Sequence, residues 1–151
     1  MTDLITGRPP RVSAAQRLVG VLTAALLGVD AYVHLHDAHL YDAVTTSWLS
    51  QGDLFRAEAV AAIVVGVALL VWPHPVGWVL AALVAGSAAG AVFLYTYVDV
   101  GRLGPLPDMY EPTWDLPGKL TSGAAEIAAT VLAVVGFALS IRDRRRRRAA
   151  G

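Results

Sequence analysis

Hydrophobic residues are gathered into four long runs that are separated by polar segments. Two of these runs are almost uninterrupted: positions 76–98 contain no charged residue, and positions 120–141 contain only Glu126. A helix needs about 20 apolar residues to cross the hydrocarbon core of a bilayer, whereas a helix of a soluble protein normally shows a polar face. We therefore predict transmembrane helices at 18–33, 54–72, 76–98 and 120–141.

The first run is the least regular of the four and has an alternative interpretation. Basic residues precede a short apolar stretch that ends at Asp30, as they do in a cleaved signal peptide. No A-x-A-like cleavage site with small residues closes the stretch, so we favour a retained helix. The expected fold class is all-α, with a four-helix transmembrane bundle as a single integral membrane domain and a basic tail at 142–151.

The composition points the same way and narrows the function. Hydrophobic residues make up 56% of the 151-residue chain and charged residues 16%, whereas a soluble domain carries about 25% charged residues. The chain has no cysteine, which excludes disulfides, thiolate metal sites and a cysteine nucleophile. Because a Gly-rich phosphate loop and a G-x-S-x-G elbow are absent as well, we do not expect an enzyme.

The formal net charge is zero, but the charges are unevenly distributed. The basic residues collect before the first run and after the fourth, at Arg8, Arg11, Arg17, Arg142 and Arg144–Arg148. Acidic residues predominate in the two long segments between runs. Basic segments stay on the cytoplasmic side, and an even number of spans places both chain ends on one side. We predict a cell-membrane protein with cytoplasmic N- and C-termini and outward-facing acidic loops.

The arginine run at 144–148 directly follows the last span. In that place it is typical of an orientation signal, and each basic residue near the surface attracts anionic lipid by about 1 kcal/mol. We therefore expect the lipid bilayer and its anionic lipids as partners, and no nucleic acid.

Two tryptophans, Trp72 and Trp78, flank the short segment 73–75 between the second and third runs. Tryptophan is enriched where a membrane protein meets the lipid headgroups. We expect both indoles to lie in an aromatic belt at this interface.

Small residues follow one another at helical spacing in the third run. Ala82, Gly86 and Gly90 are four residues apart and form a small-xxx-small stripe. Such a stripe allows two helices to approach closely, and packing of this kind drives helix association in lipid. We favour packing inside the bundle over the alternative, a homodimer or a contact with another membrane protein.

Three carboxylates, Asp30, Glu58 and Glu126, lie inside the predicted spans at similar depth toward their outer ends. A charge at membrane depth costs about 2.5–3.5 kcal/mol, so such residues usually face the bundle interior and have partners. His34 follows Asp30 by four residues on the same helix face, and Arg56 begins the second span. We predict an intramembrane polar cluster of Asp30, His34, Arg56, Glu58 and Glu126.

This polar cluster has two interpretations. In the structural one, ion pairs such as Arg56–Glu126 fix the register of the helices. In the functional one, the cluster binds a proton or a cation, or lines a small-ligand cavity that opens to the outside.

His34, His36, Asp37 and His39 form the most distinctive string of the chain. Neutral imidazole is a good ligand for Zn, Cu, Fe or Ni, so an extracytoplasmic metal ion is one hypothesis. The string resembles the H-x-H-x-D-H motif of metallo-β-lactamase-like hydrolases, but Asp37 directly follows His36 and the βαβ pattern is missing. Because no regular helix points all three histidines at one atom, we favour a polar helix end at the membrane interface and predict no cofactor.

Short strings end the first run and bracket the second: H-L-H at 34–36, H-L-Y at 39–41, G-D-L-F at 52–55 and W-P at 72–73. With these strings the first half of the chain resembles a family of small four-span membrane proteins from actinobacteria, which is largely uncharacterised. The resemblance implies the topology and the type of host. A more distant similarity to DoxX-like proteins would imply a redox accessory role.

These observations lead to three functional hypotheses. The first is a non-enzymatic accessory or partner subunit, because the chain shows no cofactor motif. The alternative is a component that binds or transports a cation, a proton or a small lipophilic ligand through the polar cluster. A membrane redox accessory protein is the third hypothesis.

Overall fold

The computed structural model describes residues 12–149, which form four long helices and one short 3-10 helix. In chain order these are α1 (Ala14–Asp37), η1 (Ala38–Tyr41), α2 (Gln51–Val71), α3 (Pro75–Tyr97) and α4 (Lys119–Ala149). Each long helix contains a span that is long and apolar enough to cross a membrane. The described part of the chain contains no β-strand, so the predicted all-α fold with four helices long and apolar enough to span a membrane is confirmed.

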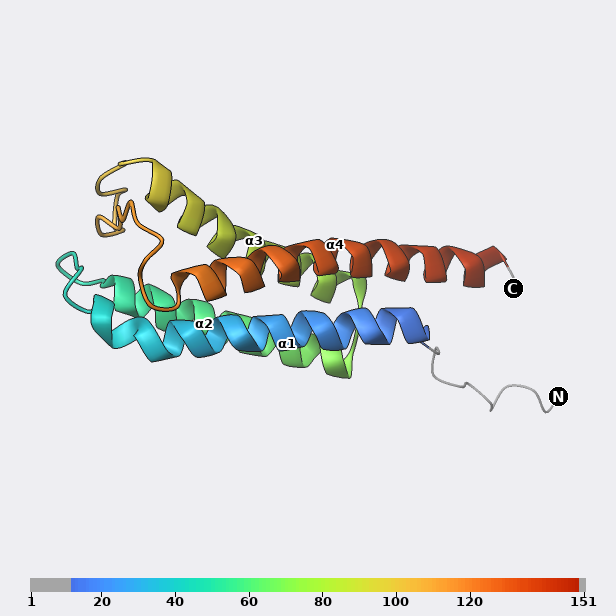
Figure 1. Ribbon diagram of the computed structural model, residues 1–151. Helices are drawn as coiled ribbons and strands as arrows, with labels where there is room; N and C mark the ends of the chain where they lie inside the picture. The colour runs from blue at the N-terminus through green and yellow to red at the C-terminus, as the bar shows by residue number, and fades with distance from the viewer. Residues whose placement is uncertain (1–11, 150–151) are drawn as a thin grey trace.

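The helices run alternately up and down, so the beginning of α1 and the end of α4 lie at the same end of the bundle (Figure 1). The short connection between α2 and α3 is at that end, and the segments 42–50 and 98–118 are at the other, which we call the loop end. α1 packs along both α2 and α4, and α3 packs mainly on α4. Arg8, Arg11 and the last two positions of the predicted basic tail lie outside the described residues.

Local polar residues set the helix ends, and they extend most helices beyond the predicted spans. The Ser13 side chain accepts a hydrogen bond from the Gln16 backbone N–H at the start of α1. Ser50 and Asp53 form a reciprocal capping box at the start of α2. α4 continues through the arginine run, because arginine is a good helix former once the chain has left the apolar region.

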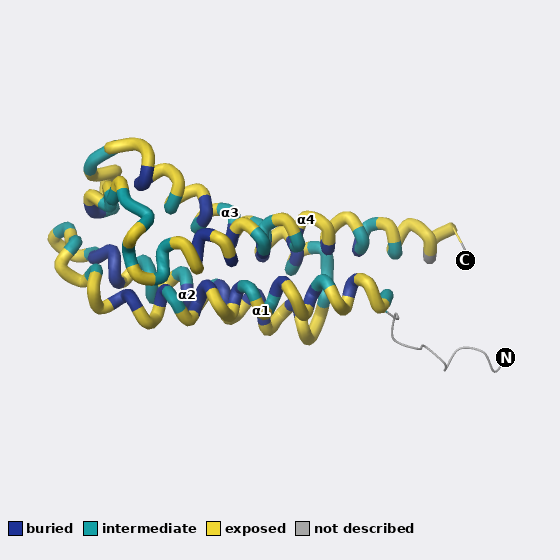
Figure 2. The backbone as a smooth tube through the Cα atoms, viewed as in Figure 1, coloured by how far each residue is buried: buried dark blue, intermediate teal, exposed yellow. Residues whose placement is uncertain are grey.

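Alanine dominates the interior of the bundle, and larger apolar side chains cover the outside. Figure 2 shows how buried and exposed positions alternate along the helices. Small side chains let helices approach closely, which is how helices associate in lipid. Leucines and valines that would be out of place on a soluble surface, such as Leu83 and Val131, are well exposed. The buried core consists of Leu27, Ala31, Ala59, Ala62, Val65, Leu69, Trp78, Ala81, Ala85, Ala129 and Ala133.

The bundle buries a stripe of small residues on α3, but this stripe lies one position before the predicted one. Ala81, Ala85 and Ala89 are buried. In the predicted stripe, Gly86 lies against Thr130 of α4, whereas a side chain at Gly90 would meet nothing within 4 Å. Ala82 packs at the edge of the core.

The expectation that both tryptophans near the short turn lie at the membrane interface is wrong for Trp78. Its side chain is completely buried, while Trp72 is largely exposed. The Trp78 ring occupies the space that Gly20 of α1 and Gly136 of α4 leave free. Two glycines on neighbouring helices thus create a hole that only a large side chain fills, and this packing outweighs the interfacial preference of the indole.

The contact between Gly136 and Trp78 yields a stability prediction. A methyl group at position 136 would overlap the Trp78 ring, and overpacking of this kind costs about 1–3 kcal/mol. Gly136→Ala should therefore lower the melting temperature in detergent. The matched control is Gly90→Ala in α3, where the space is open and helix propensity favours alanine by about 1 kcal/mol. Equal melting temperatures for the two variants would contradict the packing described for Trp78.

Candidate functional site

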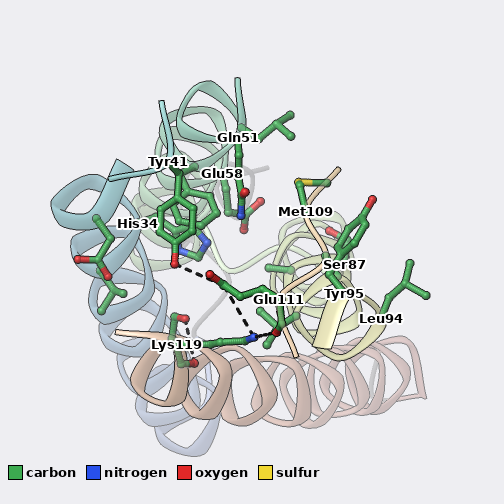
Figure 3. A pocket seen from close by; sticks show the side chains of 18 of the residues that line it. His34, Tyr41, Gln51, Glu58, Ser87, Leu94, Tyr95, Met109, Glu111 and Lys119 are labelled. Carbon is green, nitrogen blue, oxygen red and sulfur yellow. Dashed lines mark hydrogen bonds and ion pairs between the residues drawn. The ribbon is translucent and has the colours of Figure 1, made fainter. Parts of the chain in front are cut away.

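A cavity of about 780 Å³ lies at the loop end, between α1, α2, α3, the start of α4 and the segment that precedes α4 (Figure 3). Most of its lining is apolar, including Phe55, Val92 and Leu103. The polar or charged side chains on its wall are His34, Asp37, Tyr41, Gln51, Glu58, Ser87, Tyr95, Glu111, Lys119 and Ser122. Its volume falls within the range of roughly 300–1,000 Å³ that is typical of sites for small molecules.

The segment 98–118 is held against the cavity by Lys119. The Lys119 ammonium donates hydrogen bonds to the backbone carbonyls of Glu111 (2.6 Å) and Thr113 (2.8 Å), and it lies 5.5 Å from the centre of the Trp114 ring. The Tyr41 hydroxyl donates to a Glu111 carboxylate oxygen at 3.4 Å. Burial raises the pKa of Glu111, against the opposing effect of Lys119. These contacts fix the wall of the cavity that the loop provides.

A glycine is required where this loop enters α4. Gly118 has a positive φ of 75°, and a side chain on it would overlap Asp37 and Val33 of α1. The close approach of loop and helix therefore depends on the missing side chain.

Deeper in the bundle, α1 brings Asp30 and His34 together. Both residues are buried. The imidazole Nδ1 of His34 lies 2.9 Å from the Asp30 carboxylate and 3.1 Å from the Asp30 carbonyl oxygen. The His34 imidazole also packs against Phe55 of α2. The two rings meet edge to face, with 4.8 Å between their centroids. His34 is thus held in one orientation.

α4 adds Glu126 to this pair. Asp30, His34 and Glu126 each offer one oxygen or nitrogen atom, and these atoms lie within 4.8 Å of one another. Asp30 and Glu126 are fully buried. Both carboxylate oxygens of Asp30 and both of Glu126 have no hydrogen-bond partner among the described residues, although Oδ1 of Asp30 lies in ion-pair contact with His34. We call these three residues the buried triad.

Glu58 of α2 lies next to the buried triad, near enough to interact electrostatically with all three members. One of its carboxylate oxygens is buried without a hydrogen-bond partner in the described part of the chain. Glu58 and His34 also line the cavity. The two residues therefore connect the cavity to the buried triad.

Arg56, which was predicted to belong to the polar cluster, points to other partners, and the Arg56–Glu126 ion pair of the structural interpretation is not formed. The Arg56 guanidinium donates hydrogen bonds to both oxygens of Asp42, at 2.8 and 3.0 Å, and to Asp53 at 3.4 Å. Residues two apart on a helix do not face each other, so Arg56 and Glu58 cannot both point inward. The Arg56 hydrogen bond holds the pKa of Asp42 below its usual range.

The structure does not bring His34, His36, His39 and Asp37 together as one set of metal ligands. His36 stacks on Tyr32 with 5.7 Å between ring centroids, and the His39 ring contacts the carbonyl oxygen of His36. The helical twist sends His34 inward and His36 outward. Among the described residues, the group whose spacing suits a metal ion is the buried triad.

A small-ligand cavity was one interpretation of the predicted polar cluster, and His34 and Glu58 of that cluster line the cavity. Most of its other walls were not predicted. These walls come from all four long helices, η1 and a loop, and no periodic pattern in the sequence indicates them. The nearest signal was the proline- and glycine-rich segment 101–118, which contributes Leu103, Leu106, Met109 and Glu111 to the lining.

Comparisons with protein-family models, with characterised proteins and with solved structures gave no match for this chain. Its function is therefore inferred from its own cavity and buried side chains.

Asp30 lies in contact with His34, whereas Glu126 has no hydrogen-bond partner among the described residues, and this difference yields a second prediction. Asp30→Asn removes the charged partner of His34, and a buried group that loses its partner costs about 1–3 kcal/mol. Glu126→Gln removes a buried carboxylate that has no hydrogen-bond partner, so it should leave the stability unchanged or raise it. Thermal unfolding in detergent with a chelator present measures both variants. A loss for Glu126→Gln as large as that for Asp30→Asn would contradict this description of the triad.

Proposed function

We propose that this protein is a multi-pass protein of the cell membrane that binds a small, largely apolar molecule in the cavity at its loop end. The observation that carries the proposal is the cavity itself, which has the volume and the apolar lining of a small-molecule site. It favours ligand binding over the accessory role that the sequence first indicated. A few polar groups on its wall would orient the ligand.

The lining also limits the chemistry of the ligand. Ala88, Ala91 and Val92 of α3 offer an apolar wall without large side chains. The Lys119 ammonium already donates hydrogen bonds to two carbonyl oxygens, so it would attract an anionic group of a ligand only weakly. A neutral lipophilic molecule with one hydrogen-bonding end, directed toward Glu58 or Tyr41, fits this arrangement best.

Filling the cavity tests this function. Ala91→Trp places an indole in the space that the ligand would occupy, and Leu83→Trp adds the same indole on the outer surface of α3, where Leu83 is 61% exposed. Native mass spectrometry of protein released from detergent should detect a bound small molecule on the wild type and on Leu83→Trp. The adduct should be lost from Ala91→Trp.

Two results would overturn the proposed function. One is a wild-type protein that carries no adduct after gentle extraction from its membrane. The other is an Ala91→Trp variant that folds and keeps the adduct at the same stoichiometry as the wild type.

We further propose that both chain ends lie in the cytoplasm, so that the cavity opens on the outer side of the membrane. The described arginines 142 and 144–148 follow the last span, and acidic residues predominate at the loop end. This asymmetry follows the positive-inside rule. Anionic lipids of the inner leaflet would then contact the arginine run.

Reporter fusions test this orientation. A fluorescent protein fused after Gly151 should fold and fluoresce in the cytoplasm. Alkaline phosphatase inserted at the exposed Gly104 of the loop should be active, because this enzyme matures only outside the cytoplasm. An inactive loop fusion together with an active phosphatase at the C-terminus would establish the inverted topology.

A further inference from the structure

We infer that Asp30, His34 and Glu126 form a binding site for one divalent metal ion between α1 and α4, beneath the cavity. Each of the three side chains offers one ligand atom, and these atoms lie within 4.8 Å of one another. An ion at their centre would draw them together only slightly, since metal–ligand distances to nitrogen and oxygen are about 2.0–2.2 Å. This proposal does not depend on what occupies the cavity.

The buried oxygen atoms are the independent observation that points to a ligand. Asp30 and Glu126 are both completely buried, and none of their four carboxylate oxygens has a hydrogen-bond partner among the described residues. Buried polar groups are normally paired, and buried charges pair with other charges or coordinate metals. A divalent ion satisfies these oxygens at once. Two carboxylates and a neutral imidazole around such an ion form an electroneutral unit, which suits the apolar surroundings.

The ligand set also selects the class of metal. Mixed nitrogen and oxygen ligands without sulfur suit Zn²⁺, Fe²⁺ or Mn²⁺ and disfavour Cu⁺, which prefers thiolates and thioethers. Ca²⁺ is disfavoured because it takes six to eight oxygen ligands. Three protein ligands leave at least one coordination position open. The unpartnered oxygen of Glu58, which interacts electrostatically with Glu126, could fill it.

The position of the site supplies an entry path. His34, a member of the buried triad, and Glu58, which lies next to it, both line the cavity, so an ion can reach the triad through the cavity and not through lipid. Because the ligands come from two helices, a bound ion would join α1 to α4. Anything that binds the folded state alone stabilises it, so the ion should raise the melting temperature.

Metal titration of the full chain in detergent tests the site. After treatment with a chelator, the protein is titrated with Zn²⁺ or Mn²⁺, with Mg²⁺ as a reference ion. Elemental analysis after desalting and the melting temperature are the readouts. We expect one Zn²⁺ or Mn²⁺ per protein and a higher melting temperature, with no such response to Mg²⁺.

Matched variants locate the ion. Glu126→Gln should weaken the binding at least tenfold, because changing even an outer-shell partner of a metal site typically costs about 10–100-fold in affinity. The control is the double variant His36→Ala/His39→Ala, which removes two exposed imidazoles outside the triad and should bind as the wild type does. Circular dichroism and size-exclusion chromatography verify that each variant folds, and His34→Ala is a second test of the triad.

Three outcomes would overturn the inference. The first is a wild-type protein that takes up no stoichiometric ion, which would mean that the triad holds protons only. The second is unchanged binding in both Glu126→Gln and His34→Ala. The third is a loss of binding in the double variant alone, which would place the ion on the exposed histidines.

Discussion

The close approach of alanine-rich helix faces is the interaction on which the rest of the structure depends. In lipid, helices gain little from hiding apolar surface from one another, so close packing has to hold them together. Ala31 on α1 and Ala129 on α4 are buried in this contact, and each lies within one turn of a carboxylate. The packing that joins the two helices therefore also brings Asp30 and Glu126 to the same place, without a separate device for building the triad.

α3 gives the bundle its asymmetry. At the turn end, Trp78 fills the hole between Gly20 and Gly136 and anchors α3 to both α1 and α4. Toward the loop end, α3 moves away from α2 (Figure 1), and the cavity lies between them. The loop that Lys119 holds in place then forms the last wall. A tight anchor at one end and divergence at the other explain why the cavity lies where the polar residues are.

The sequence predicts whatever depends on one helix at a time. Span lengths follow from the apolar runs, and the pairing of Asp30 with His34 follows from the four-residue repeat of a helix. The depth of Glu126 also indicated its meeting with Asp30. Predictions that required two helices at a known angle were less successful. Arg56 does not point into the polar cluster, because it lies two residues before the inward-facing Glu58 and so on another face of α2. It pairs instead with Asp42 on the neighbouring loop. The hole around Trp78 and most walls of the cavity are formed by several helices together, so no single sequence segment predicts them.

The cavity and the buried triad solve one physical problem at two depths. Carboxylates inside a membrane are costly unless water, a counter-charge or an ion reaches them. Glu58 and His34 border the cavity, so a ligand or water can satisfy them from that side. Asp30 and Glu126 are sealed behind them, where a water molecule could donate only two hydrogen bonds to several oxygens. A divalent cation neutralises both carboxylates at once, and a single proton leaves one of them charged. The deeper position is therefore where the proposed ion would lie, and the shallower one is where the proposed exchangeable molecule would bind.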